Sequence, residues 1–310
     1  MDKPWLDYHK QVSLLVERGL HVDDEDAVAT FLSKVSYYRL SGYFRYWQIA
    51  PADGDDRFLP GSSFTTIERL YAAEQALLMV LDEVLHPIEV LLRTRFAYYY
   101  AKKVGATNTF PRGEGLTQPP DTHAMRVEEY ALSDLDRSKE SFVSRYRQGP
   151  KVGSRYGADA YATMPIWVAV EAFSFGSLSR LIEASGQSGV LAVLARSLEV
   201  SPRTLPSQVR SFVYLRNRVA HCARLWNHSV LDVPGLLPNV SRRAKREHRQ
   251  FSDHSVYKIL IALDLIATRS GLADTWLSSH VDPLLESNPL LCAGITSPTR
   301  YGNVPRHLLV

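Results

Sequence analysis

The spacing of the apolar residues is the feature that most constrains this fold. Along most of the 310 residues, apolar side chains recur every three or four positions, and long alternating runs of β-branched residues are missing. A period near 3.6 residues places the apolar side chains on one stripe of a helix, whereas strands require alternation. The pattern therefore predicts an all-α protein, in which the apolar stripes of the helices meet in a shared core.

Stretches rich in proline and glycine divide the predicted helices. The stretch 50–64 separates an N-terminal helical segment, residues 1–60, from a larger helical domain, residues 61–282. Prolines and glycines recur throughout residues 283–310, so this tail is predicted to be irregular.

Composition excludes several classes of function. The chain has 36 Lys and Arg residues against 33 Asp and Glu, a formal net charge of +3, which is too small to indicate nucleic-acid binding by the whole surface. Two cysteines exclude a disulfide framework or a thiolate zinc cluster and favour a reducing compartment, so the cytoplasm is expected. We expect no signal peptide and no membrane span, because no apolar run is long enough. No cofactor or metal is expected, since the histidines lack zinc-ligand spacing and no nucleotide-binding glycine-rich loop is found.

A helix predicted over 206–227 carries the candidate chemistry. Five apolar residues fall on one narrow arc of its helical wheel: Phe212, Leu215, Val219, Cys222 and Trp226. This places Cys222 in the core. A polar stripe lies opposite and consists of Asn217, His221, Arg224 and His228. Arg216 lies to the side, and its long side chain can reach this stripe.

An arginine, an amide and an imidazole on one rigid face suit metal-independent RNA cleavage, in which the ribose 2′-hydroxyl attacks the adjacent phosphorus. An imidazole exchanges protons near neutral pH, and an arginine binds the charge that develops on the phosphoryl oxygens. The candidate catalytic residues are therefore Arg216, Asn217 and His221. One histidine does not easily serve as both acid and base, so two copies facing each other in a homodimer are expected to form a composite site. From spacing alone, the same residues also fit a solvated helix face, and a second Arg/His pair with the same spacing occurs at Arg243 and His248.

The string around these residues is more specific than their spacing. Residues 215–227, LRNRVAHCARLWN, resemble the C-terminal signature of the Abi-like (AbiD/AbiF) abortive-infection family of bacteria. Residues 37–43, YYRLSGY, are similar to a second hallmark of that family, and the segments 86–93 and 174–178 fit its layout in the right order. The resemblance covers about residues 5 to 270.

The resemblance implies a HEPN-like helical bundle with an N-terminal helical extension, and a homodimer that pairs two Arg/His motifs. It also implies metal-independent endoribonuclease activity and a role in phage defence or toxin-like growth arrest. Arg216 and His221 correspond to the catalytic pair, and Asn217 orients or hydrogen-bonds at the site. Arg224 and Asn227 match further family positions and are RNA-binding candidates. RNA is then the substrate, and a structured non-coding RNA is a possible partner. The alternative is an RNA-binding protein that holds a partner non-coding RNA in a stable complex while its nuclease is silent or conditional.

Aromatic and basic clusters supply the other RNA-binding candidates. The segment 37–47 has six aromatic residues and two arginines, which either contact RNA or, for the aromatics, fill the core. The segment 242–249 either binds the RNA backbone or forms a solvated face. The candidates in these and a third cluster are Arg39, Arg45, Arg93, Arg242, Arg243, Lys245, Arg246 and Arg249.

Overall fold

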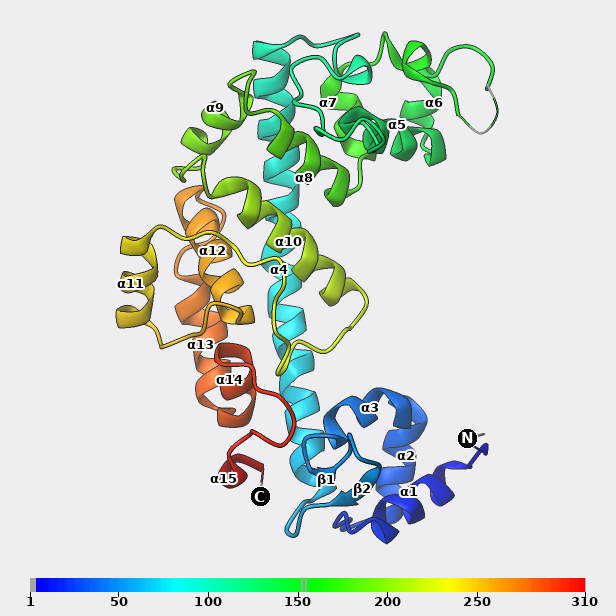
Figure 1. The fold of residues 1–310 in the computed structure, drawn as a ribbon, viewed down its shortest axis with the longest axis vertical. Helices are drawn as coiled ribbons and strands as arrows, with labels where there is room; N and C mark the ends of the chain where they lie inside the picture. The colour runs from blue at the N-terminus through cyan, green and yellow to red at the C-terminus, as the bar shows by residue number, and fades with distance from the viewer. Residues whose placement is uncertain (1–3, 152, 154, 310) are drawn as a thin grey trace.

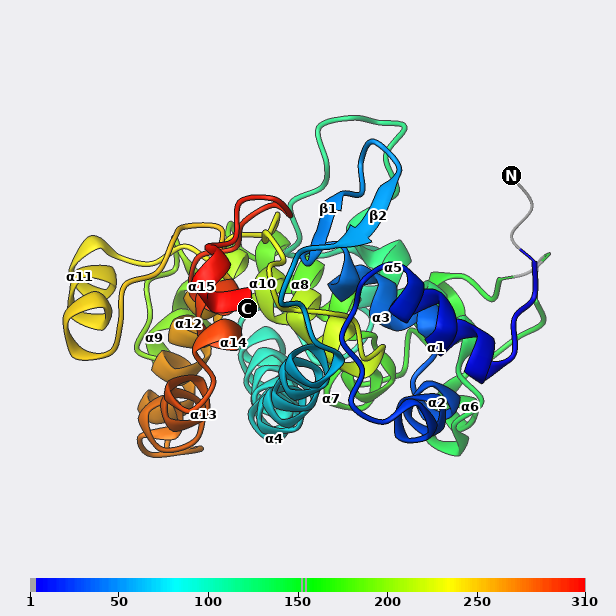
Figure 2. The same ribbon diagram turned by 90° about the horizontal axis from the view of Figure 1, so that it is seen from below.

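The computed structural model describes residues 4–151, 153 and 155–309. It confirms the all-α prediction, because the described residues form a series of helices, α1 to α15, with one short two-stranded sheet. Figures 1 and 2 show these helices arranged around one long central helix.

The N-terminal segment consists of three short helices and a hairpin: α1 (Tyr8–Glu17), α2 (Glu25–Lys34), α3 (Tyr37–Phe44), β1 (Gln48–Ala50) and β2 (Asp55–Phe58). Each helix begins at a side-chain cap, in which Asp7, Asp24 and Ser36 accept a backbone N–H three residues later. The antiparallel hairpin lies partly within the stretch that was predicted to be a loop. Gly54 in its turn has φ 86°, a conformation that glycine adopts without strain.

The central helix α4 (Phe64–Lys103) has 40 residues and connects the two ends of the molecule (Figure 1). It begins at Ser63, whose hydroxyl accepts the N–H of Thr66 at 3.3 Å. The helix continues through Pro87. In Figure 1 the N-terminal segment lies at one end of α4, and the helices that come directly after α4 in sequence lie at the other.

Five helices gather around the C-terminal half of α4: α5 (Val127–Arg137), α6 (Ser141–Tyr146), α7 (Ile166–Ala169), α8 (Phe175–Ala184) and α9 (Val190–Ser197). Helices α7, α8 and α9 contact α4 directly, and α5 packs against α8.

The predicted catalytic helix is α10 (Leu205–Ala220), which is followed by α11 (Pro238–Glu247) and α12 (Val256–Arg269). Helices α10 and α12 pack against α4 and against each other. Phe212 and Leu215 of α10 are fully buried, as the apolar period predicts. Packing of the apolar face therefore fixes α10 at the centre of the fold and sets the direction in which its polar face points.

The tail was predicted to be irregular, and that prediction is wrong for much of its length. It contains α13 (Asp282–Glu286), α14 (Pro289–Thr296) and α15 (Arg306–Leu309). Two of its prolines, Pro283 and Pro289, stand in the first turn of a helix, where a missing N–H costs nothing. The tail also packs on the core, since the indole N–H of Trp47 donates to the Leu309 carbonyl at 2.8 Å. Figure 2 shows α12, α13 and α14 on one side of α4 and α1 and α2 on the other.

Among the described residues, no helix combines the length and the apolar character needed to cross a bilayer. Helix α4 is long enough, but its charged side chains, such as Asp82 and Glu83, interrupt the apolar sequence.

Candidate functional site

Helix α10 ends earlier than the apolar period predicts. Cys222 has a left-handed backbone with φ 47°. Its N–H donates to the Val219 carbonyl at 2.9 Å, and the N–H of Ala223 donates to the Arg218 carbonyl at 2.8 Å. This is the Schellman pattern that ends many helices. The helical wheel fails past this point, so the core position predicted for Cys222 is wrong, and its thiol is exposed.

The three candidate catalytic residues share the C-terminal end of α10. The N–H of His221 donates to the Asn217 carbonyl at 3.1 Å, so the two residues lie one helical turn apart on the same face. Nη1 of Arg216 donates to the side-chain oxygen of Asn217 at 3.1 Å. His221 is exposed, whereas the side chain of Arg216 is 32% exposed. The structure therefore joins Arg216 to Asn217 and leaves His221 open to solvent beside them.

Glu89 on α4 orients Arg216. One carboxylate oxygen of Glu89 accepts Nε of Arg216 at 3.2 Å, and the other accepts Arg93. Arg93 also donates to the Val170 carbonyl, and its side chain is only 11% exposed. Arg93 was predicted to bind RNA, but it lies in this internal network. Among the described residues no partner is found for Nη2 of Arg216, so this edge of the guanidinium can donate to an oxyanion.

The N-terminal aromatic-basic segment docks onto the loop that follows α10. Arg39 donates to the carbonyl of Cys222. In the opposite direction, Arg224 donates to the carbonyl of Gly42, across 182 residues of sequence. The two segments that carry the sequence resemblance therefore contact each other, and two of the RNA-binding candidates, Arg39 and Arg224, form that contact.

Most of the aromatic residues in this segment are core residues. The buried ones are Tyr43, Phe44, Tyr46 and Trp47. Tyr46 and Trp47 pack on Trp226, with ring centroids 4.5 Å and 5.8 Å from its ring. Tyr38, in contrast, is 88% exposed. Arg45 is exposed as well and lies 5.7 Å from the ring centroid of Tyr301.

Glu74 on α4 joins these segments, and the sequence argument missed it. One of its carboxylate oxygens accepts the N–H groups of Leu225 and Trp226, each at 2.6 Å, and the other accepts the Tyr43 hydroxyl. Burial raises the pKa of Glu74 above its usual range, while the three hydrogen bonds oppose that rise. The available signal was an acidic residue at a core position of the apolar stripe of α4, since Leu70 and Leu78 lie four residues to either side of it.

Asn227, another RNA-binding candidate, is enclosed within the fold. Its side-chain oxygen accepts the N–H of Thr299 at 3.0 Å, and its own N–H donates to the Gly294 carbonyl at 3.2 Å. A Cβ added at Gly294 would lie 2.3 Å from the ring of Trp226, so only glycine permits this close packing. The end of the signature string therefore anchors the C-terminal tail.

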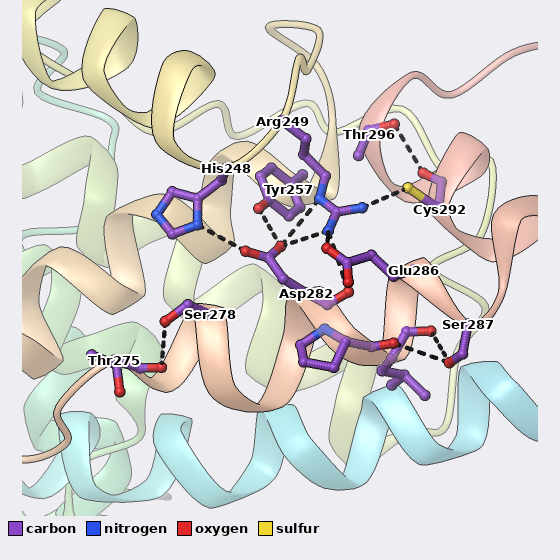
Figure 3. A network of polar contacts seen from close by, with 12 residues as sticks. His248, Arg249, Tyr257, Thr275, Ser278, Asp282, Glu286, Ser287, Cys292 and Thr296 are labelled. Atoms are coloured by element: carbon purple, nitrogen blue, oxygen red, sulfur yellow. Dashed lines mark hydrogen bonds and ion pairs between the residues drawn. The ribbon is translucent and has the colours of Figure 1, made fainter.

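Arg249 belongs to a polar network around Asp282 (Figure 3). The carboxylate of Asp282 accepts Nε of Arg249 at 3.1 Å and the hydroxyl of Tyr257 at 2.6 Å, and Nδ1 of His248 lies 2.8 Å away. Arg249 also donates to the sulfur of Cys292 at 3.0 Å, and its side chain is 16% exposed. Arg249 therefore connects α13 and α14 to the segment after α11, although RNA binding was predicted for it.

The remaining basic RNA-binding candidates lie on α11, so the basic segment predicted from the sequence forms a helix. Arg242, Arg243 and Arg246 are exposed, and Lys245 is partly buried. Glu247 lies 2.7 Å from Arg243 and 3.4 Å from Arg246, so one carboxylate partly neutralises two guanidinium groups. A surplus of positive charge remains on this face, and RNA binding there stays a prediction.

His228, in the loop after α10, has a shifted pKa. It stacks on Tyr214 with ring centroids 5.8 Å apart. Burial, followed by the charges of Arg218 and Arg224, lowers the pKa of His228 to about 4. Both Arg224 and His228 lie in the loop after α10 and not on the helical stripe where they were predicted. His228 is therefore neutral at pH 7.

This shift predicts a pH-dependent stability. The unfolded chain protonates His228 near its ordinary pKa, and the folded chain does so only near pH 4, so stability is full above about pH 6.5 and falls as the pH drops toward 4. Because the ring is only half buried, we expect a loss of about 1–2 kcal/mol from this residue. Urea unfolding at several pH values should show a shallower acid loss for His228→Phe, which keeps an aromatic ring against Tyr214. Equal pH slopes for the two proteins would contradict the assignment.

The end of α10 offers hydrogen-bond donors and one proton-exchanging group. Among the described residues, no group of three or more His, Cys, Asp or Glu side chains is placed to hold a metal ion. The oriented guanidinium of Arg216 can bind a phosphoryl oxygen, and the imidazole of His221 can accept or donate a proton.

Comparison with known proteins gives one match. The profile of a protein family described as Abi-like protein matches residues 30–227. The matched region runs from within α2 to Asn227 in the loop after α10, and it includes both segments that dock on each other. No curated protein and no solved structure matches the chain.

Proposed function

The chain belongs to the Abi-like protein family, and on that premise we propose that it acts in anti-phage abortive infection as a metal-independent HEPN endoribonuclease. The observation that supports this most directly is the exposed end of α10. There Glu89 and Asn217 orient Arg216, and His221 is open to solvent. A fixed donor for a phosphoryl oxygen beside a free imidazole is what cleavage by the 2′-hydroxyl requires.

In the proposed reaction, a base removes the proton of the 2′-hydroxyl, and this oxygen forms a bond to the adjacent phosphorus. The bond between phosphorus and the 5′-oxygen of the next nucleotide breaks, and an acid protonates that oxygen. The products are a 2′,3′-cyclic phosphate and a 5′-hydroxyl. His221 supplies one proton transfer, and Arg216 stabilises the added negative charge on the phosphoryl oxygens.

A homodimer completes this scheme. Each chain has one His221 at the end of α10, so two chains related by a two-fold axis supply both an acid and a base. The exposure of His221 supports this arrangement, because the residue remains available to a second copy. Light scattering at micromolar concentration should then give the mass of a dimer, and a monomer would contradict the composite site.

A second candidate function is supported by α11. Its exposed arginines, Arg242, Arg243 and Arg246, suit sequence-independent contact with an RNA backbone. The protein would then hold a structured non-coding RNA in a stable complex and keep its nuclease silent until infection. Sequencing of the RNA that co-purifies separates the two: one defined RNA in stoichiometric amount supports the complex.

The nuclease is tested with RNA in the presence of EDTA. We expect cleavage without added metal, and we expect it to stop when the ribose at the cut site is replaced by 2′-deoxyribose. Cleavage of that deoxy substrate at an unchanged rate would exclude 2′-hydroxyl attack. Purified dimer that leaves RNA intact under all these conditions would overturn the proposal of a constitutive nuclease.

A further inference from the structure

A basic cavity lies beside α5 and α6. Figure 1 shows these two helices at the end of the molecule opposite α1 and α2. The volume of the cavity is about 600 Å³. The end of α5 and the loop after α6 line it. Its basic lining residues are Arg137, Lys139, Arg147, Lys151 and Arg155.

Arg147 builds the wall of this cavity. It donates to the carbonyls of Leu135 at 2.5 Å and Ser138 at 3.0 Å, and to the hydroxyl of Tyr161 at 3.1 Å. Its guanidinium lies 4.6 Å from the ring centroid of Tyr156. These contacts fix the loop after α6 against the C-terminal end of α5, where a cation is favourable.

The acceptors of Arg147 are all neutral, so its charge is not cancelled by a carboxylate, and the charges of the other four cations are only partly cancelled. Arg137 and Arg155 each pair with one carboxylate, Asp134 and Glu129. Lys139 and Lys151 are exposed, and no carboxylate within 4.0 Å is found for either of them in the described part of the chain. The field in the cavity is therefore positive, even with Asp136 in its wall.

We propose that this cavity binds the phosphodiester backbone of an RNA strand, away from the site of cleavage. Every lining residue is polar or charged, and the others are serines and Asp136. A protein segment docked in a groove is held by apolar pockets or by backbone pairing, which this lining does not offer. Phosphate oxygens match it, because arginine and lysine contacts to phosphates need no particular sequence. The inference rests on the proposed function in taking RNA as the ligand.

The test measures RNA binding rather than cleavage. The full-length protein carries His221→Ala so that RNA stays intact, and it is titrated against fluorescein-labelled oligouridine in EDTA at several salt concentrations. Adding Lys139→Glu and Lys151→Glu should weaken binding about 10-fold or more and reduce the log–log salt slope by about 1. The matched control reverses two exposed lysines on α1 and α2, Lys10→Glu and Lys34→Glu, and should change the affinity less than about 2-fold, since those helices lie at the other end.

Equal affinities for the cavity variant and the control variant would overturn the inference. The inference would also be overturned if polyglutamate, or inorganic phosphate at micromolar concentration, displaced the RNA. The first result would identify an acidic peptide as the occupant of the cavity, and the second would identify a small anion. Unchanged melting temperatures establish that both double variants are folded. If the cavity variant is not folded, Lys139→Gln with Lys151→Gln is used in place of the two glutamate substitutions. The binding assay does not depend on cleavage. Salt-dependent binding that requires the cavity would support this inference even if the wild-type protein cut no RNA, so the cavity proposal and the nuclease proposal can fail independently.

Discussion

Replacing His221 with alanine is expected to slow RNA cleavage by about 10²–10⁴-fold, the usual contribution of one general acid or base. His221 is exposed and lies at the last turn of α10, beside the oriented Arg216. Within the described residues its side chain has no hydrogen-bond partner, so replacement by alanine should change the stability of the fold little. The initial rate on a labelled RNA in EDTA measures the effect.

The matched control is His280→Ala. His280 is an exposed histidine in the segment just before α13, outside the end of α10. Its loss should leave the cleavage rate within about 2-fold of wild type, because it removes an imidazole of the same chemistry from a different surface. Cleavage by the His221→Ala protein at the wild-type rate would remove His221 from the mechanism and with it the composite site.

The apolar period succeeds where packing decides the structure. Phe212 and Leu215 are buried, and their helix packs against α4 and α12. A repeat of 3.6 residues places both side chains on the same stripe of the helix, so the sequence predicts their burial. The same period fails at Cys222, where the backbone turns left-handed. Beside that turn, Arg39 donates to the Cys222 carbonyl and Arg224 donates to the Gly42 carbonyl, and both contacts join segments far apart in the sequence. Local pattern carries no information about such contacts.

The candidate site shows the same division. The string around Arg216, Asn217 and His221 indicates where the chemistry lies, because those residues share one helix. Glu89 and Glu74 approach from α4, and only the fold brings them there. Prolines mislead for a different reason: Pro283 and Pro289 look like helix breakers, but both occupy first turns that need no N–H donor.

Glu74→Leu is expected to destabilise the protein by about 2–5 kcal/mol. Leucine has a similar volume, so packing changes little, but the buried N–H groups of Leu225 and Trp226 and the hydroxyl of Tyr43 lose their acceptor. Each unsatisfied buried donor costs about 1–3 kcal/mol, and removing a buried carboxylate returns part of that cost. Urea unfolding at pH 7 measures the difference.

Two controls separate the hydrogen bonds from the charge. Glu74→Gln keeps a side-chain oxygen for the two N–H groups, so it should cost only about 1 kcal/mol. Glu83→Leu changes an exposed glutamate of the same helix and should change stability by less than about 0.5 kcal/mol. If Glu74→Leu is as stable as Glu83→Leu, the loop after α10 is held by the aromatic packing of Trp226 and not by the buried carboxylate.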